Sequence, residues 1–106
     1  MIQITLRLQT DIEHSPAILK ALRTIAVSSK LERGCLRSEV LQDTNDTCLL
    51  QYAEEWESEE ELNRQIRSER FTRLLALMEA ASEPPEFQLR FIDSICGLEY
   101  VEAHRR

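Results

Sequence analysis

The sequence predicts an α+β fold, a ferredoxin-like βαββαβ sandwich in which two helices cover one face of four antiparallel strands. Four segments alternate apolar and polar residues as half-buried strands do, and apolar residues recur at helical spacing between the first two strands and between the last two. Only two glycines and three prolines occur in 106 residues, which leaves little chain for irregular loops. At this length, we expect a single domain over residues 1–106.

The first strand is expected over residues 2–9, where every second side chain is apolar. Ser15 followed by Pro16 is typical of a helix N-cap with proline at the first helical position. This first helix should end near residues 30–33, with Gly34 placed to adopt a left-handed conformation. The first strand and the first helix are therefore both predicted from local patterns.

A β-hairpin follows, with strands over residues 36–42 and 47–56 joined by the polar turn 43–46. A second helix begins almost at once after Trp56, because Ser58 and Glu61 have the spacing of a capping box. The carboxylates of residues 59–61 also lie at the positive end of the helix dipole. We therefore assign the acidic run 54–61 to the helix start and a solvated face.

The second helical region should extend from about residue 59 to residue 81, with a bend near Ser68, where a second N-cap precedes Glu69. Pro84 and Pro85 end it. A fourth strand is expected over residues 87–92. The residues beyond Gly97 allow a short extra C-terminal strand over residues 98–102.

Composition limits the function classes. The net charge is −6, and the longest basic run is the terminal pair Arg105-Arg106, so no nucleic acid is expected as a partner. No apolar stretch approaches the ~18 residues of a membrane span, and no secretion signal opens the chain, so we expect no membrane partner. The three cysteines lack metal-site spacing and favour reduced thiols, a cytoplasmic location and no bound metal.

One face of the predicted sheet has no helix to cover it. On the first strand this face carries the polar side chains of Gln3, Thr5, Arg7 and Gln9. Two such sheets can pack face to face and enclose a partly polar cavity. We therefore expect the chain to partner itself as a homodimer.

Three motifs carry a resemblance to a known family. The segment from Glu32 to Arg37, the segment from Tyr52 to Leu62, and Ser68-Glu69-Arg70-Phe71 resemble the antibiotic biosynthesis monooxygenase family at this spacing. The resemblance covers roughly residues 1–95. It implies a dimeric α+β barrel and, for the quinol monooxygenase-like members, oxygenation of quinols or polycyclic phenols without a metal or flavin cofactor. A small aromatic substrate and no cofactor are therefore expected.

The sequence also departs from that family. Many quinol-oxidising members carry a His at the position of Gln65 and another at the position of Arg70, so both imidazole bases are replaced here. The residues typical of haem-degrading members are also missing, so we do not expect haem degradation. Two alternatives stay open: a dimeric small-molecule binding or sensing module that lost catalysis, and a purely structural dimer without a cavity.

Five residues are the candidates for the site. Tyr52 could donate its phenol to a substrate oxygen, or lie buried against backbone. Arg70 could stabilise a substrate anion, or form a helix-surface salt bridge with a neighbouring glutamate. These two are the candidate catalytic residues.

The other three candidates would bind substrate. Trp56 could stack on an aromatic ring or close the core. The resemblance places Gln65, like Arg70, at a helix position that lines the pocket. Arg7 projects from the uncovered face of the sheet.

Overall fold

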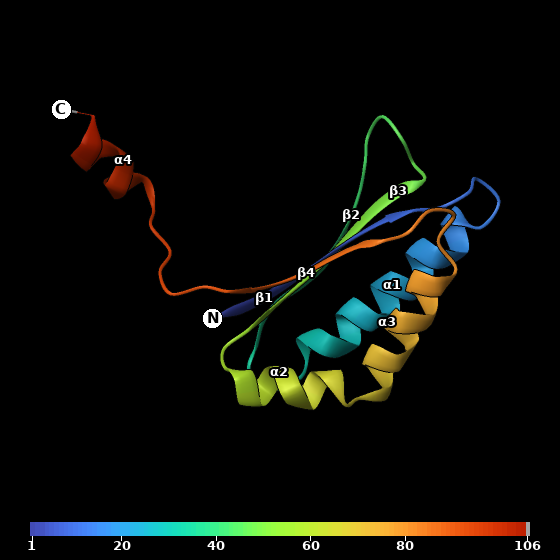
Figure 1. The fold of residues 1–106 in the computed structure, drawn as a ribbon, viewed down its shortest axis with the longest axis horizontal. Coiled ribbons are helices and arrows are strands. Elements are labelled where there is room, and N and C mark those ends of the chain that lie inside the picture. Colours follow the sequence, from blue (N-terminus) through green and yellow to red (C-terminus); the bar gives the residue numbers. More distant parts are fainter. Residues whose placement is uncertain (106) are drawn as a thin grey trace.

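The computed structural model describes residues 1–105 and confirms the ferredoxin-like α+β fold (Figure 1). The sheet has the order β2-β3-β1-β4, and every neighbouring pair is antiparallel. No helix within these residues is long and apolar enough to cross a membrane. In chain order the elements are β1 (Ile2–Gln9), α1 (Ser15–Lys30), β2 (Cys35–Gln42), β3 (Leu49–Trp56), α2 (Glu59–Ile66), α3 (Glu69–Glu79), β4 (Glu86–Phe91) and α4 (Leu98–His104).

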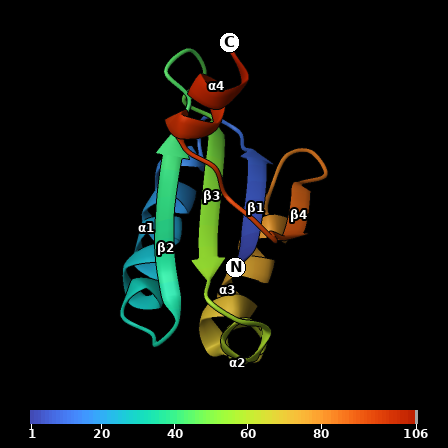
Figure 2. The ribbon, with the colours of Figure 1, turned by 90° about the vertical axis from the view of Figure 1, so that its left-hand side faces the viewer.

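The helices α1, α2 and α3 all lie on one side of the sheet, and the other face is bare of them (Figure 2). Every second residue of β1 points to the helices and is buried, as the alternation predicted. The same side of β3 is fully buried, whereas β4 lies at the sheet edge and is exposed along its length. The hydrophobic core therefore lies between α1, α3 and the inner strands β1 and β3.

Both predicted serine caps of the second helical region are present. The Ser58 hydroxyl accepts a hydrogen bond from the Glu61 amide at the start of α2, and Ser68 does the same for Phe71 at the start of α3. Ser68 thus separates two helices where the sequence predicted one bent helix. This break turns the chain back along α1 and brings the end of α2 close to the start of α3.

The start of α1 differs from the prediction. Ser15 is the first helical residue rather than the N-cap, and its hydroxyl donates to the Thr47 carbonyl at 2.9 Å. A buried hydroxyl that ties the helix to the β2–β3 hairpin is satisfied without capping. Gly34 has φ +85° as expected, and a Cβ at this position would overlap the side chain of Glu61.

The extra C-terminal strand is wrong: this segment is the helix α4. A strand needs a neighbouring edge to satisfy its backbone, and the chain leaves the sheet after β4 (Figure 1). The segment instead bonds locally, with the Tyr100 amide donating to the Gly97 carbonyl at 3.1 Å and the Tyr100 and His104 rings stacked at 4.1 Å. Leucine, glutamate and alanine in this segment also favour a helix.

We predict that Ser58→Ala lowers the free energy of unfolding by about 1 kcal/mol, because it leaves the first turn of α2 without its cap. Urea denaturation followed by circular dichroism measures the change. Ser28→Ala in α1 is the control, since Ser28 makes no side-chain hydrogen bond within residues 1–105. Equal stability of the Ser58→Ala variant and the parent would contradict the prediction.

Candidate functional site

A buried glutamate lies at the centre of the candidate site. Glu54 is on β3, faces the helices and has 0% of its surface exposed. Its carboxylate accepts hydrogen bonds from the phenol of Tyr52 and from the indole Nε1 of Trp56, the latter at 2.8 Å. Residues two apart on a strand share a face, so β3 itself places these three side chains together.

The helix α2 supplies a third donor. Gln65 is buried, and its Nε2 donates to the Glu54 carboxylate at 3.0 Å and to the Ser29 hydroxyl of α1 at 2.9 Å. The amide oxygen of Gln65 accepts from the Nε of Arg70 at 3.2 Å. Gln65 therefore connects a buried carboxylate to a guanidinium that lies nearer the surface.

The site is closed on its outer side by an ion pair. Arg70, at the start of α3, contacts Glu32 in the loop after α1, with 2.9 Å between Nη1 and Oε1. The hollow beneath this pair, beside Trp56 and Gln65, has a volume of only about 10 Å³. A ring-sized ligand can reach Glu54 from this side only if Arg70 and Glu32 separate.

The surroundings of Glu54 favour neutral partners. Burial, followed by the nearby Glu54 carboxylate, raises the pKa of Tyr52 well above its ordinary value of 10.0, so the phenol stays a hydrogen-bond donor. Burial also raises the pKa of the Cys35 thiol, which disfavours the reactive thiolate. Ser38, beside Glu54 in the sheet, is the one residue of 1–105 with a buried side-chain oxygen that has no hydrogen-bond partner.

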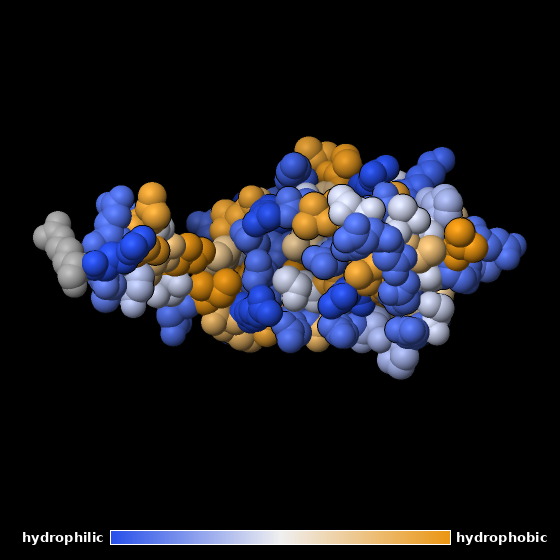
Figure 3. Space-filling model, turned by 90° about the horizontal axis from the view of Figure 1, so that it is seen from above, coloured by the Kyte–Doolittle hydropathy of each residue, from blue (hydrophilic) through white to orange (hydrophobic). Residues whose placement is uncertain are grey.

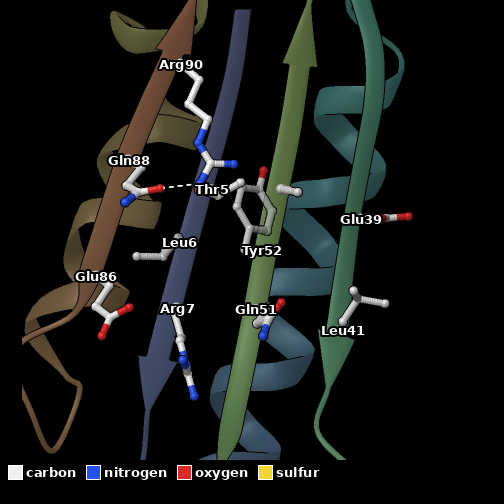
Figure 4. Close-up of a pocket in the computed structure, with 11 residues that line it drawn as sticks. Thr5, Leu6, Arg7, Glu39, Leu41, Gln51, Tyr52, Glu86, Gln88 and Arg90 are labelled. Carbon is white, nitrogen blue, oxygen red and sulfur yellow. Dashed lines mark hydrogen bonds between the residues drawn. The ribbon is translucent and has the colours of Figure 1, made fainter. Parts of the chain in front are cut away.

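A second hollow lies on the uncovered face of the sheet (Figure 4). It has a volume of about 420 Å³ and is lined by side chains of all four strands, among them Arg7, Gln51, Gln88 and Arg90. Figure 4 shows Arg7 and Arg90 at different heights along the neighbouring strands β1 and β4, with Gln88 between them in height. This hollow is wide and shallow, and it is separated from Glu54 by the sheet.

The structure brings four of the five candidate residues together. Tyr52, Trp56, Gln65 and Arg70 form one connected network, whereas Arg7 lies on the opposite face of the sheet. Tyr52 bonds a carboxylate rather than backbone or solvent, and Trp56 is a core residue with 1% of its surface exposed. Arg70 forms an ion pair, but with Glu32 instead of a helix neighbour.

Glu54 is the residue that the sequence analysis missed. The acidic run 54–61 was assigned to the helix start and a solvated face, and for Glu54 that assignment is wrong. The signal was present: on a strand, an acidic residue midway between Tyr52 and Trp56 must point into the same buried layer as both aromatic rings. Within residues 1–105, His, Cys, Asp and Glu side chains form no group of three that could hold a metal ion.

Comparisons with known proteins identify the family and the fold. Residues 1–77 match the family model described as antibiotic biosynthesis monooxygenase. A Deinococcus radiodurans protein assigned provisionally to these monooxygenases has a similar structure, with a TM-score of 0.81 and 16% identity over 92% of this chain and 97% of that chain. No curated protein matches the chain.

Two other solved structures are alike in fold. A Pseudomonas aeruginosa protein has a TM-score of 0.74 and 24% identity, with 88% of this chain and 94% of that chain covered. A conserved Methanosarcina mazei protein has a TM-score of 0.74 and 23% identity, with 84% and 89% covered. At these identities, the likeness establishes the fold only.

We predict that Glu54→Gln lowers the free energy of unfolding by about 1–3 kcal/mol, because the new amide leaves at least one buried donor of the network unsatisfied. Glu55→Gln is the matched control, since the half-buried Glu55 side chain pairs with the exposed Arg37 outside the Glu54 network, and this change should alter stability by less than about 0.5 kcal/mol. Chemical denaturation of both variants measures the difference. Equal losses in the two variants would contradict a structural role of the buried carboxylate.

The raised pKa of Tyr52 also predicts a pH dependence. A group whose folded pKa lies above its unfolded value stabilises the fold fully below the unfolded value, so this contribution is lost as the pH rises above 10.0. In a Tyr100→Phe background, which leaves Tyr52 as the single tyrosine, the phenolate absorbance at 295 nm should rise only when the protein unfolds. A rise near pH 10 in the folded protein would show that Tyr52 reaches solvent.

Proposed function

Because this chain belongs to the antibiotic biosynthesis monooxygenase family, we propose that it is a cofactor-independent monooxygenase acting on a quinol or polycyclic phenol. The observation that supports the proposal is the buried Glu54 carboxylate, which three neutral donors hold in place beneath Arg70. It offers a proton acceptor in contact with Gln65, one of the two positions where many family members carry histidine. A base, an indole and a guanidinium in one place would together suit a quinol or a polycyclic phenol.

In this mechanism the substrate itself supplies the electrons. The carboxylate of Glu54 accepts the phenolic proton, and the resulting anion reduces dioxygen and recombines with it. One oxygen atom stays in the product and the other leaves as water, so that a quinol and dioxygen give a hydroxyquinone and water. The protein needs only to exclude water, orient the ring and stabilise the anion.

The side chains divide these tasks by position. The indole of Trp56 and the phenol of Tyr52 lie on either side of Glu54 on the same strand face and would orient the ring. The Arg70 side chain is 20% exposed, and its guanidinium would stabilise the phenolate once its contact with Glu32 opens. Gln65 hydrogen-bonds both Arg70 and Glu54 and would hold these two side chains in a fixed relative position.

The partner in this proposal is a second copy of the chain. The uncovered sheet face carries a hollow of about 420 Å³ that is open to solvent in the single chain. A copy seated face to face would enclose it and place Arg7 of both chains in one chamber. Because the sheet separates this chamber from Glu54, Arg7 would bind a polar group of a ligand held in the chamber, and not the ring at Glu54.

We predict that the purified protein consumes dioxygen above the buffer rate with at least one member of a panel of hydroquinones and anthrones, as measured with an oxygen electrode. Glu54→Gln should lower the rate by about 100- to 10,000-fold, the usual range for loss of a general base. Arg70→Gln should lower it roughly 10- to 100-fold through lost anion stabilisation. Arg73→Gln, on the same helix but outside the network, is the control and should act like the parent.

A second candidate function is a binding or sensing module without catalysis. It is favoured by the volumes of the two hollows, which are about 420 Å³ on the uncovered face and only about 10 Å³ beside Trp56. It is also favoured by Gln65 and Arg70, which stand at the two positions where many family members carry histidine. In that case aromatic ligands raise the melting temperature without oxygen uptake. Arg7→Gln would then abolish the shift in melting temperature, and Glu54→Gln would leave it in place.

A further inference from the structure

The small hollow beneath the Arg70–Glu32 ion pair opens through a charged rim. Besides Trp56 and Gln65, every residue that lines this hollow is charged. The charged residues come from the loop after α1, from α2 and from the start of α3, which meet at one end of the molecule (Figure 1). We call this rim the entrance and define it as Glu32, Arg33, Glu61, Arg64 and Arg70.

Glu61 is a fixed part of the entrance. Its carboxylate pairs with Arg64 at 2.8 Å and with Arg33 at 3.5 Å, and only 15% of its side chain is exposed. The side chain also lies against Gly34, where a Cβ would overlap it. Two cations and a close approach to the backbone therefore hold Glu61 in place.

Glu32 is held by fewer contacts. Within residues 1–105 its carboxylate pairs with Arg70 alone, at 2.9 Å, and 40% of its side chain is exposed. A single ion pair that solvent reaches contributes little to stability, so Glu32 can leave Arg70 at small cost. Arg70 stays in place through a second contact, in which its Nε donates to the amide oxygen of Gln65 at 3.2 Å. The entrance thus combines a fixed guanidinium with an exchangeable carboxylate.

Apolar surface gathers elsewhere on this protein. Figure 3 shows it along the C-terminal segment, where Ile95, Leu98 and Val101 are 46–72% exposed. The entrance instead presents charged side chains around the buried indole of Trp56. A ring without a charge would displace the Arg70–Glu32 pair and leave the guanidinium without a carboxylate. A ring that carries an anion replaces the pair that it displaces.

We propose that Glu32 holds the place of a carboxylate on the ligand, so that the substrate class of this site is a quinol or phenol that carries a carboxylate next to a hydroxyl group. The ligand carboxylate takes the contact with Arg70, and Glu32 turns into solvent. Arg70 exchanges one carboxylate for another and keeps a charge-assisted hydrogen bond in both states. This inference rests on the proposed function and names the substrate class of the same site.

The guanidinium also determines where the carboxylate lies on the ring. It has five N–H donors in a planar fork, and Gln65 together with one carboxylate occupies only some of them. The fork can therefore hold the ligand carboxylate and the neighbouring phenolate oxygen together. The carboxylate fixes the ring at the entrance, and the ring extends inward past Trp56 toward Glu54.

Anaerobic titration calorimetry tests the exchange without turnover. The probe 1,4-dihydroxy-2-naphthoate should bind at least about tenfold more tightly than 1,4-dihydroxynaphthalene, the same quinol without the carboxylate, because it gains a charge-assisted hydrogen bond. Arg70→Gln should abolish this preference. Glu32→Gln keeps the size of the side chain but removes the competing carboxylate, and it should raise the affinity for the carboxylated quinol about tenfold.

Glu60→Gln is the matched control. It removes the same charge from a side chain that is 82% exposed and contacts Arg64 at 3.9 Å, outside the entrance. Its affinity for the carboxylated quinol should stay within about twofold of the parent. Circular dichroism of each variant checks that the fold is kept.

Equal affinities for the two quinols, or no detectable binding of either, would overturn the inference. Equal gains in Glu32→Gln and Glu60→Gln would also overturn it, because they would reflect only the general loss of negative charge. Oxygen uptake tests the proposed oxygenation separately. Carboxylate-dependent binding without oxygen uptake would keep the ligand class and overturn the oxygenation, whereas oxygen uptake with neutral quinols and no preference for the carboxylate would do the reverse.

Discussion

The buried carboxylate of Glu54 is the constraint around which the interior is arranged. A carboxylate without solvent must be hydrogen-bonded, and the cost of leaving it unpaired exceeds what most single contacts contribute. Tyr52 and Trp56 from the same strand and Gln65 from α2 meet that need, and Ser29 of α1 holds Gln65 in place. One acidic side chain thereby fixes how the helix layer sits on the sheet, and it places the candidate chemistry inside the core.

The two faces of the sheet differ in polarity and in whether helices cover them. The helix side is apolar apart from the Glu54 network and is closed by the Arg70–Glu32 ion pair. The other side is polar, hollowed and without cover. The candidate site and the uncovered face are thus separated by the sheet.

Local patterns predicted most of the fold. They failed where a contact between residues far apart in the sequence, or the lack of one, determined the local structure. The capping serines at positions 58 and 68 and the alternation of β1 act over a few residues, so the elements they define were correct. Ser15 was assigned as a cap but bonds Thr47, which is 32 residues away. The segment at Leu98 to Glu102 was allowed as a strand, but no sheet edge of the chain lies beside it, and it forms a helix.

By itself, the sequence determined the order of helices and strands, the polar face of β1 and the family resemblance, because periodicity and capping are local and motifs are read in one dimension. Only the tertiary structure decided that Glu54 joins Tyr52, Trp56, Gln65 and Arg70, and that Arg7 lies across the sheet from them. Which residues share a site depends on how helices pack on a sheet, and that packing joins residues far apart in the chain.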